Sequence, residues 1–253
     1  MSIESEDDLR ALERVGQLVA RTLAAMEQAL EAGVAGVTTA DLDAVGGACL
    51  RAGGARSAPQ VFYACPAMTL ISVNDEVVHG LPGRRRLHPG DVVKLDVTAE
   101  LDGYVADAAR TVVVPPGRPI GDGLRNAARA AFARASASAR AGMPVSGIGR
   151  EVERSVTRDG FSVIRELSGH GVGRAIHESP NVPNFFDPRQ RDVLTEGLVL
   201  TIEPLIAERP CSMVMKPDGW TLRTDNGALA AHFEETIVIT RGAPLVLTRL
   251  PQP

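Results

Sequence analysis

The sequence predicts an α/β (α+β) fold with two pseudo-symmetric halves around a central antiparallel sheet. Three observations predict it. Amphipathic helical segments alternate with short β-rich segments, residues 90–111 have the pattern of a β-hairpin with two acids inside its strands, and the order of elements repeats after about 106 residues. We therefore expect one domain over residues 1–253, with its halves at about 1–118 and 119–253.

In the first half, two helices precede the hairpin. Apolar residues recur every three or four positions up to about residue 32, with Asp7 or Asp8 as the expected N-cap and glycines at 33 and 36 as the end. A second helix should begin at Thr38 or Thr39 and end at Gly53-Gly54. Short strands are expected at 61–63 and 69–73.

The second half repeats this order. Helices are expected at about 121–141 and 148–158, and strands at 161–164 and 198–202. An irregular stretch should then run to about residue 229, before a last strand at 233–240. The hairpin motif Gly90, Val92, Leu95, Asp96 reappears 107 positions later as Gly197, Val199, Ile202, Glu203. Such a constant shift over helix, loop and strand indicates two copies of one helix-helix-strand-hairpin unit.

Composition and charge exclude several classes of protein. The net charge of −4 argues against a general nucleic-acid binder, and no apolar run approaches the length of a membrane span. The three cysteines form no CxxC pair, which argues against a disulfide framework and a thiolate metal site. We expect a cytoplasmic protein with no membrane partner and no specific nucleic-acid partner.

The two acids of the hairpin, Asp96 and Asp107, should share one face of the sheet. If Asp102 and Gly103 form a two-residue turn, cross-strand partners sum to 205, so that Asp107 lies opposite Thr98. Thr98 shares its face with Asp96, because side chains alternate along a strand. A three-residue turn would place the acids on opposite faces. A single strand acid would more simply be a solvated turn residue, but a pair on one face requires a counter-charge.

The repeat supplies two further strand acids, Glu203 and Glu234. Four carboxylates on one inner face carry the charge that two divalent cations neutralise. An oxygen-rich set with one imidazole suits Mn, Fe, Co or Zn. His170, in the segment Ser168-Gly169-His170-Gly171-Val172-Gly173, and His177 are the candidate imidazoles, because Gly permits close approach and imidazole can bind metal or transfer protons. We assign no catalytic role to His88 or His232.

Five motifs, taken together, resemble the type I methionine aminopeptidases of the pita-bread fold. They are His79-Gly80, GDVVKLDV with Asp96, GHGVGRAIHE with His170 and His177, TIEP with Glu203, and HFEETIVIT with Glu234. Their order and spacing cover nearly the whole chain. The resemblance implies removal of N-terminal methionine from peptides and nascent chains, by a monomer that also works at the ribosome.

The resemblance also implies a role for each site residue. Two divalent metal ions are implied, with Asp96 on one, His170 and Glu203 on the other, and Asp107 and Glu234 bridging them. A metal-bridged hydroxide would attack the first peptide bond, and Glu203 would move the proton to the leaving amine. His177 would bind the carbonyl oxygen, and His79 would contact the scissile amide.

The methionine pocket departs from the family pattern. Phe62 and Trp220 are expected walls, although Phe62 fits equally well as a core residue. The unusual pocket residues are Pro59, Cys65, Leu70 and Ile176, and those beside the hairpin acids are Lys94 and Val105-Ala106. A narrow apolar pocket should still prefer methionine through fit.

Two alternatives use the same residues differently. An Xaa-Pro aminopeptidase or dipeptidase of this fold has the same five ligands but usually adds an N-terminal domain, whereas only 78 residues precede His79. A non-catalytic binding relative would have lost metal ligands, and this chain keeps all five.

Overall fold

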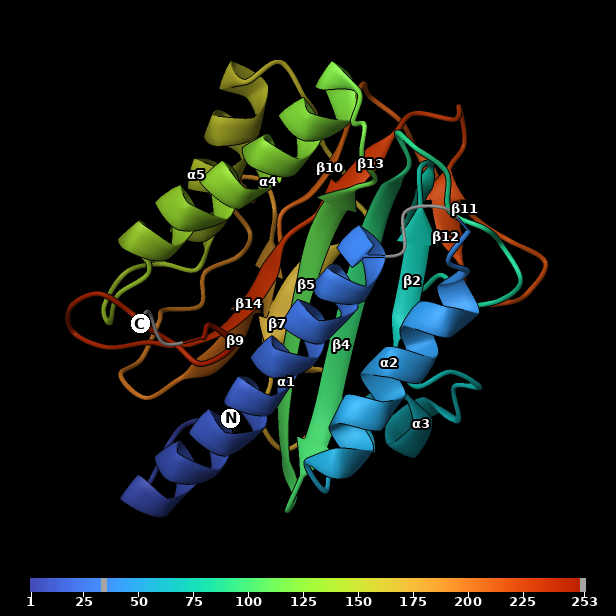
Figure 1. Ribbon diagram of the computed structural model, residues 1–253. Helices are drawn as coiled ribbons and strands as arrows, with labels where there is room; N and C mark the ends of the chain where they lie inside the picture. Colours follow the sequence, from blue (N-terminus) through green and yellow to red (C-terminus); the bar gives the residue numbers. More distant parts are fainter. Residues whose placement is uncertain (33–35, 251–253) are drawn as a thin grey trace.

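A long antiparallel hairpin forms the centre of the computed structural model, which describes residues 1–32 and 36–250 (Figure 1). Its strands are β4 (Val92–Leu101) and β5 (Tyr104–Val113). Asp102 and Gly103 between them have φ of 54° and 81°, the left-handed values that a type I′ turn requires. Leu101 pairs with Tyr104 and Thr98 with Asp107. The expected two-residue turn and register are confirmed.

The main sheet has two related halves that meet where β5 contacts β14 (Glu234–Val238). Its order is β1-β4-β5-β14-β9-β7-β8, with β2 on β4 and β15 on β14. The hairpin pair β4 and β5 thus lies beside β9 and β14, as the repeat predicts. The other strands are β1 (Arg56–Ser57), β2 (Leu70–Val73), β7 (Ser168–Gly171), β8 (Glu178–Pro183), β9 (Val199–Ile202) and β15 (Leu245–Val246).

One pair of helices from each half covers the same face of this sheet. In Figure 1, α1 (Glu6–Ala32) and α2 (Thr39–Ala52) lie against the half with β4 and β5, and α4 (Pro119–Ser138) and α5 (Ser146–Arg158) against the other half. Ser5, rather than Asp7 or Asp8, caps α1, because its Oγ accepts from the Asp8 N–H. Thr38 and Asp41 form a capping box before α2. Gly33 lies outside the described residues.

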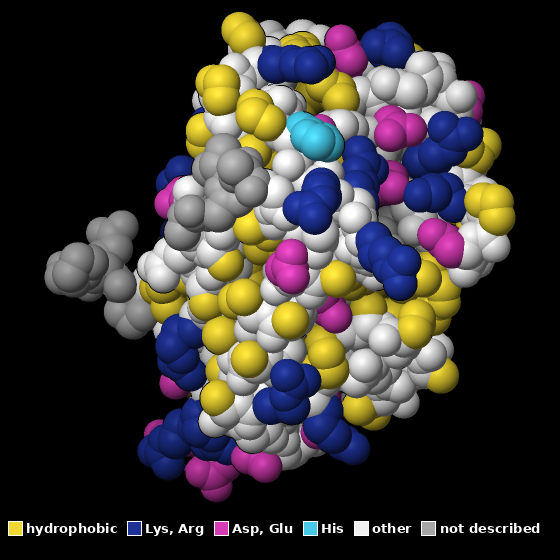
Figure 2. Space-filling model, turned by 45° about the vertical axis from the view of Figure 1, so that its right-hand side comes forward, with side chains coloured by type: hydrophobic (Ala, Val, Ile, Leu, Met, Phe, Trp, Pro, Cys, Tyr) yellow, Lys and Arg dark blue, Asp and Glu magenta, His cyan; other side chains and the backbone are white. Residues whose placement is uncertain are grey.

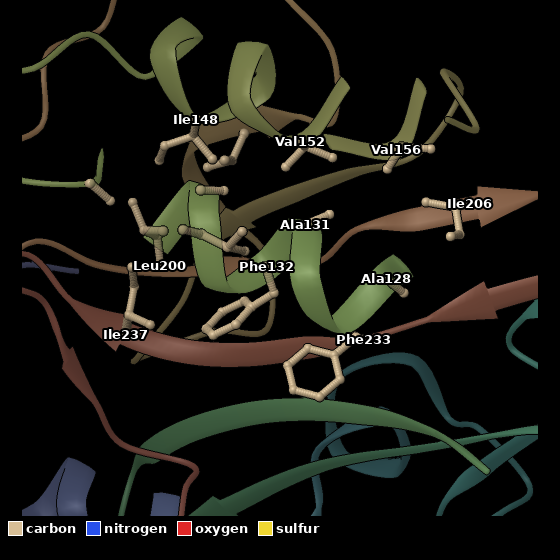
Figure 3. Packing of buried hydrophobic residues seen from close by; sticks show 14 of the residues in the cluster. Ala128, Ala131, Phe132, Ile148, Val152, Val156, Leu200, Ile206, Phe233 and Ile237 are labelled. Carbon is tan, nitrogen blue, oxygen red and sulfur yellow. The ribbon is translucent and has the colours of Figure 1, made fainter. Parts of the chain in front are cut away.

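The second half has its own hydrophobic core. Figure 3 shows α4 between α5 and strand β14, with Phe132 of α4 close to Phe233. The two rings are tilted, with centroids 5.2 Å apart. Alanines on α4, among them Ala128 and Ala131, let α5 pack closely on it. A core built mainly from aliphatic side chains is what the low aromatic content predicts.

Two expectations about local structure are wrong. Residues 61–63 are not a strand but the end of the helix α3 (Ala58–Tyr63), because Pro59 favours the first turn of a helix. The stretch to residue 229 is not irregular, because it contributes to two small sheets. These sheets, ordered β13-β10-β6 and β11-β12-β3, contain β3 (Glu76–Val78), β6 (Ser162–Val163), β10 (Leu205–Ala207), β11 (Met213–Met215), β12 (Leu222–Thr224) and β13 (Ala230–His232).

The surface agrees with the charge pattern of the sequence. Figure 2 shows Lys and Arg side chains interspersed with Asp and Glu over the face in view, rather than gathered in one basic field. Within the described part of the chain, every helix is too short or too polar to span a lipid bilayer.

Candidate metal centre

Three strand acids and one acid that follows a strand line up on the face of the sheet opposite the four helices α1, α2, α4 and α5. Asp96 of β4 and Glu234 of β14 both pair with Ala109 of β5, from opposite sides. Ile202 pairs with Glu235, so continuing this register by one residue places Glu203 opposite Glu234. Asp107 shares the face of Ala109, because it lies two residues before it. The small Ala109 side chain leaves the carboxylates room to converge.

Burial raises the pKa of all four acids. Asp107, Glu203 and Glu234 are 6%, 8% and 2% exposed, and Asp96 is partly exposed. The pKa of Asp107 rises to about 7 through burial. The pKa values of Asp96, Glu203 and Glu234 rise well above their ordinary values, first through burial and then through the neighbouring carboxylates. Water cannot stabilise four carboxylate charges here, so in the absence of a cation these groups favour their protonated, neutral forms.

The described part of the chain supplies hydroxyl groups to these acids but no positive side chain. Thr98 donates a hydrogen bond of 2.8 Å to Asp107. Over residues 1–32 and 36–250, no Lys or Arg forms an ion pair with any of the four acids. Glu234 Oε1 is buried without a hydrogen-bond partner. Such a set fits divalent cations, which would neutralise the charge and lower the raised pKa values.

His170 of β7 faces this row of acids as a neutral imidazole. Its Nε2 lies 3.6 Å from Glu203 Oε1. Its Nδ1 lies 3.0 Å from the Gly171 carbonyl oxygen, which can only accept, so the proton resides on Nδ1 and Nε2 is free as a ligand. Burial lowers the pKa of His170 to about 4. Asp107, His170 and Glu234 each offer one ligand atom, and these atoms lie within 4.8 Å of one another.

His79 and His177 border the same cavity. Tyr63 Oη lies 2.6 Å from His177 Nδ1, and the His177 ring meets His170 edge-on at 4.4 Å between centroids. Burial lowers the pKa of His177 and brings that of His79 to about 4. His79 has a φ of 58°, an unusual backbone value for a non-glycine residue at the edge of a site.

The cavity in front of the acids measures about 140 Å³. Trp220 lines it, but Phe62 does not, because α3 directs Phe62 away, where it is 39% exposed, and gives its neighbour Tyr63 the place at the wall. Cys65 is buried in a small cluster that Trp220 also contacts. The remaining apolar lining consists of Pro59, Leu70, Val78, Leu167, Ile176 and Leu205.

The unusual residues beside the hairpin acids do not add charge to the site. Lys94 is 1% exposed, and its Nζ donates to the carbonyl oxygens of Asn74 (2.9 Å) and Val92 (3.2 Å). Burial lowers the pKa of Lys94 to about 7. Val105 and Ala106 are fully buried in the hydrophobic core.

The sequence does not predict that His232 lies beside the acids. This residue ends β13 with 2% exposure, and its Nε2 lies 3.5 Å from Glu203 Oε2 and 3.4 Å from Glu234 Oε2. Burial lowers its pKa to about 3. The one signal in the sequence was its spacing of two residues from Glu234, which puts both side chains on one face of an extended chain.

Comparison with known proteins gives consistent results. Residues 10–241 match the model of metallopeptidase family M24. The chain is 38% identical over 252 residues to methionine aminopeptidase 2 of Bacillus subtilis strain 168, covering 99% of this chain and 100% of that protein. The crystal structure of a Thermotoga maritima methionine aminopeptidase superposes with a TM-score of 0.94 at 33% identity, covering 99% and 100% of the two chains.

A prolidase also has this fold. The enzyme of Pyrococcus furiosus superposes with a TM-score of 0.77 at 22% identity, covering 99% of this chain and 66% of the prolidase. This likeness concerns the fold alone.

Proposed function

The chain belongs to metallopeptidase family M24, and on this premise we propose that it removes the N-terminal methionine from peptides and nascent proteins in a metal-dependent reaction. One observation carries the proposal: a row of buried acids, without Lys or Arg partners among the described residues, faces the imidazole of His170. The full-length similarity to methionine aminopeptidases supports methionine as the residue released.

Five residues would hold two divalent ions: Asp96, Asp107, His170, Glu203 and Glu234. Their four carboxylates match the charge of two such ions, and the oxygen-rich set with imidazole suits Mn, Fe, Co or Zn. Glu234 is the natural residue to be shared, since it lies in both groups of potential ligands. When bound, such ions act as Lewis acids that polarise a carbonyl group and lower the pKa of water.

Glu203 is the residue that we assign to proton transfer. Its Oε1 atom lies 3.6 Å from His170 Nε2. One of its carboxylate oxygens would accept a proton from the attacking water and then deliver it to the leaving amine.

His177 would bind the carbonyl oxygen of the scissile bond, and Tyr63 would set its tautomer. Burial raises the pKa of Tyr63, so the hydroxyl keeps its proton and can donate it to His177 Nδ1. The ring proton then resides on Nε2, which becomes the donor that a carbonyl oxygen requires. His79 would contact the scissile amide from the same cavity.

The side chain of the substrate methionine would occupy the apolar part of the cavity. Trp220, Leu70 and Ile176 supply hydrophobic surface there, and Tyr63 takes the place expected for Phe62. An unbranched, flexible thioether adapts to such walls better than a branched side chain. Peptides that begin with methionine should therefore be cleaved faster than peptides that begin with leucine.

The organisation of the site supports further parts of the proposal. Both halves of the chain contribute ligands, so we propose one catalytic domain over residues 1–253, with halves at about 1–118 and 119–253. All five ligands come from one chain, which supports a monomer. Action on nascent chains would place the enzyme in the cytoplasm and near the ribosome.

The decisive experiment measures methionine release from the peptide Met-Ala-Ser. Activity should disappear on treatment with a chelator and return with Co²⁺, Mn²⁺, Fe²⁺ or Zn²⁺, and His170→Ala should stay inactive under all conditions. Full activity without bound metal would overturn the mechanism. The peptide Leu-Ala-Ser tests the preference of the pocket for the first side chain. The peptide Met-Pro-Ser tests the tolerance for the second residue.

A further inference from the structure

His232 is a buried imidazole that has no hydrogen-bond partner among the described residues. Both of its ring nitrogens are inaccessible and make no hydrogen bond. Its backbone is fixed, because Thr111 Oγ1 donates to the His232 carbonyl oxygen (2.8 Å) and accepts from the His232 N–H (2.9 Å). A buried polar side chain in this condition is rare in folded proteins and requires an explanation. The ring faces the row of acids.

The imidazole stands against two acids at once. Its Nε2 lies 3.5 Å from Glu203 Oε2 and 3.4 Å from Glu234 Oε2. The other oxygen of Glu203 lies 3.6 Å from His170 Nε2. Glu203 is thus flanked by two imidazoles, one at each carboxylate oxygen.

These separations suit atoms that share a cation better than atoms that share a proton. Two donors bound at ~2.1 Å from one metal, at tetrahedral or octahedral angles, lie about 3.0–3.4 Å apart. A charge-assisted hydrogen bond would be about 2.7–2.9 Å long. Glu203, His232 and Glu234 each offer a ligand atom, and these atoms lie within 4.8 Å of one another. His170 belongs to a second such group, which shares only Glu234 with the first.

We propose that His232 Nε2 is a sixth protein ligand of the metal centre, beside Glu203 and Glu234. The inference rests on the proposed metal-dependent function and adds a neutral nitrogen donor to the oxygen-rich set. A second imidazole should raise the affinity of the centre for Zn²⁺ and Co²⁺ more than for Mn²⁺, because imidazole suits the former ions better than an oxygen-preferring one.

The test observes the histidine nitrogens directly. The full-length protein, labelled with ¹⁵N in histidine, is freed of metal and titrated with Zn²⁺, and the imidazole resonances are followed by NMR. The Nε2 resonances of both His170 and His232 should move to metal-bound positions. In His232→Gln, which keeps a polar group but not the imidazole ligand, only the His170 resonance should move. His88→Gln, a change at an exposed histidine, identifies an unrelated resonance and serves as the matched control.

Affinity gives an independent measurement. Competition with a coloured chelator should show that His232→Gln weakens the binding of one Zn²⁺ or Co²⁺ by about tenfold or more, with a smaller loss for Mn²⁺. If Zn²⁺ binds and the His232 Nε2 resonance keeps its proton, His232 is a hydrogen-bond donor to the acids and the proposal is wrong. If no ion binds to the wild-type protein, the proposed function itself fails.

Discussion

Glu234 and Glu235 are adjacent residues of one strand, both almost fully buried, but their carboxyl groups have different electrostatic surroundings. Glu235 points toward the helices, where Arg110 Nη2 donates to it at 2.8 Å and Thr248 Oγ1 at 2.6 Å. Glu234 points to the face opposite the helices, where it has no Lys or Arg partner in the described chain, and its Oε1 makes no hydrogen bond. Their exposures are 2% and 1%, so burial alone does not distinguish them.

The difference teaches how a structural acid can be told from a functional one. Burying a carboxylate is costly unless a positive or hydrogen-bonding group compensates it. Glu235 is compensated by its own chain, so its role is complete when the protein folds. Glu234 lacks such compensation among the described residues, and we propose that a bound cation supplies it. Alternation along β14 puts these two solutions on opposite faces of the sheet.

The largest effect is expected for Glu234→Gln. Removal of a shared ligand should lower kcat/KM for Met-Ala-Ser by at least about 1000-fold, or ~4 kcal/mol, because metal activation of the carbonyl group is lost. The free energy of unfolding of the metal-free protein should not fall, since the Oε1 atom of the buried Glu234 carboxyl group has no hydrogen bond to lose. Activity within tenfold of wild type would show that Glu234 is not a shared ligand.

Glu235→Gln should affect stability instead. Arg110 would lose its buried anionic partner, and the free energy of unfolding should fall by about 2–4 kcal/mol. Breaking a fully buried ion pair costs about 3–5 kcal/mol, and we expect somewhat less here because the Arg110 side chain is 18% exposed. Urea denaturation measures this loss. The folded Glu235→Gln protein should bind metal with the affinity of the wild type. If its metal affinity fell as much as that of Glu234→Gln, the proposed difference in role between the two acids would be wrong.

Acidification should weaken metal binding on the face opposite the helices. The pKa of Asp107 without metal is about 7, so below this pH the metal must displace a proton from it. The apparent Kd should rise by about tenfold per pH unit for each proton displaced as the pH falls from 7 to 5. Titration calorimetry in buffers of different ionisation enthalpy measures the protons released. A Kd independent of pH would mean that the acids are already ionised.

The smallest effect is expected for Tyr63→Phe. Loss of its hydrogen bond would let His177 adopt either tautomer, which should lower kcat by about tenfold or less, or at most ~1.4 kcal/mol, while KM and metal affinity stay close to wild type. The pH profile of kcat should also change on its acidic side, because His177 would lose the group that fixes its proton. A change in metal affinity would instead place Tyr63 with the ligands.

Much of the face opposite the helices could be predicted from the sequence because its signals are local. The Asp102-Gly103 turn fixes the register of the hairpin, and the register fixes which acids share a face. The 107-residue repeat then predicts Glu203 as the counterpart of Asp96 in the second half. The first inference needs only alternation and turn geometry, and the second needs the internal repeat.

Other features depend on contacts that a local pattern cannot encode. Residues 61–63 favour a strand by composition, but Pro59 and the tertiary context make them the end of a helix, which exchanges Phe62 for Tyr63 at the cavity. The strands β10 to β12 have only three residues each, too few for a visible alternation. His232 looks like an isolated histidine, because Glu203 approaches it only in the folded sheet.

The strand order also determines when during synthesis the centre can first form. Asp96 and Asp107 belong to a hairpin that can fold as soon as the first half has been made, whereas Glu234 lies on a strand inserted between β5 and β9. A growing chain that has not yet reached residue 234 holds only part of the ligand set. Glu234 is the last of the proposed ligands to be synthesised, so the full set of buried acids exists only after residue 234 has been made.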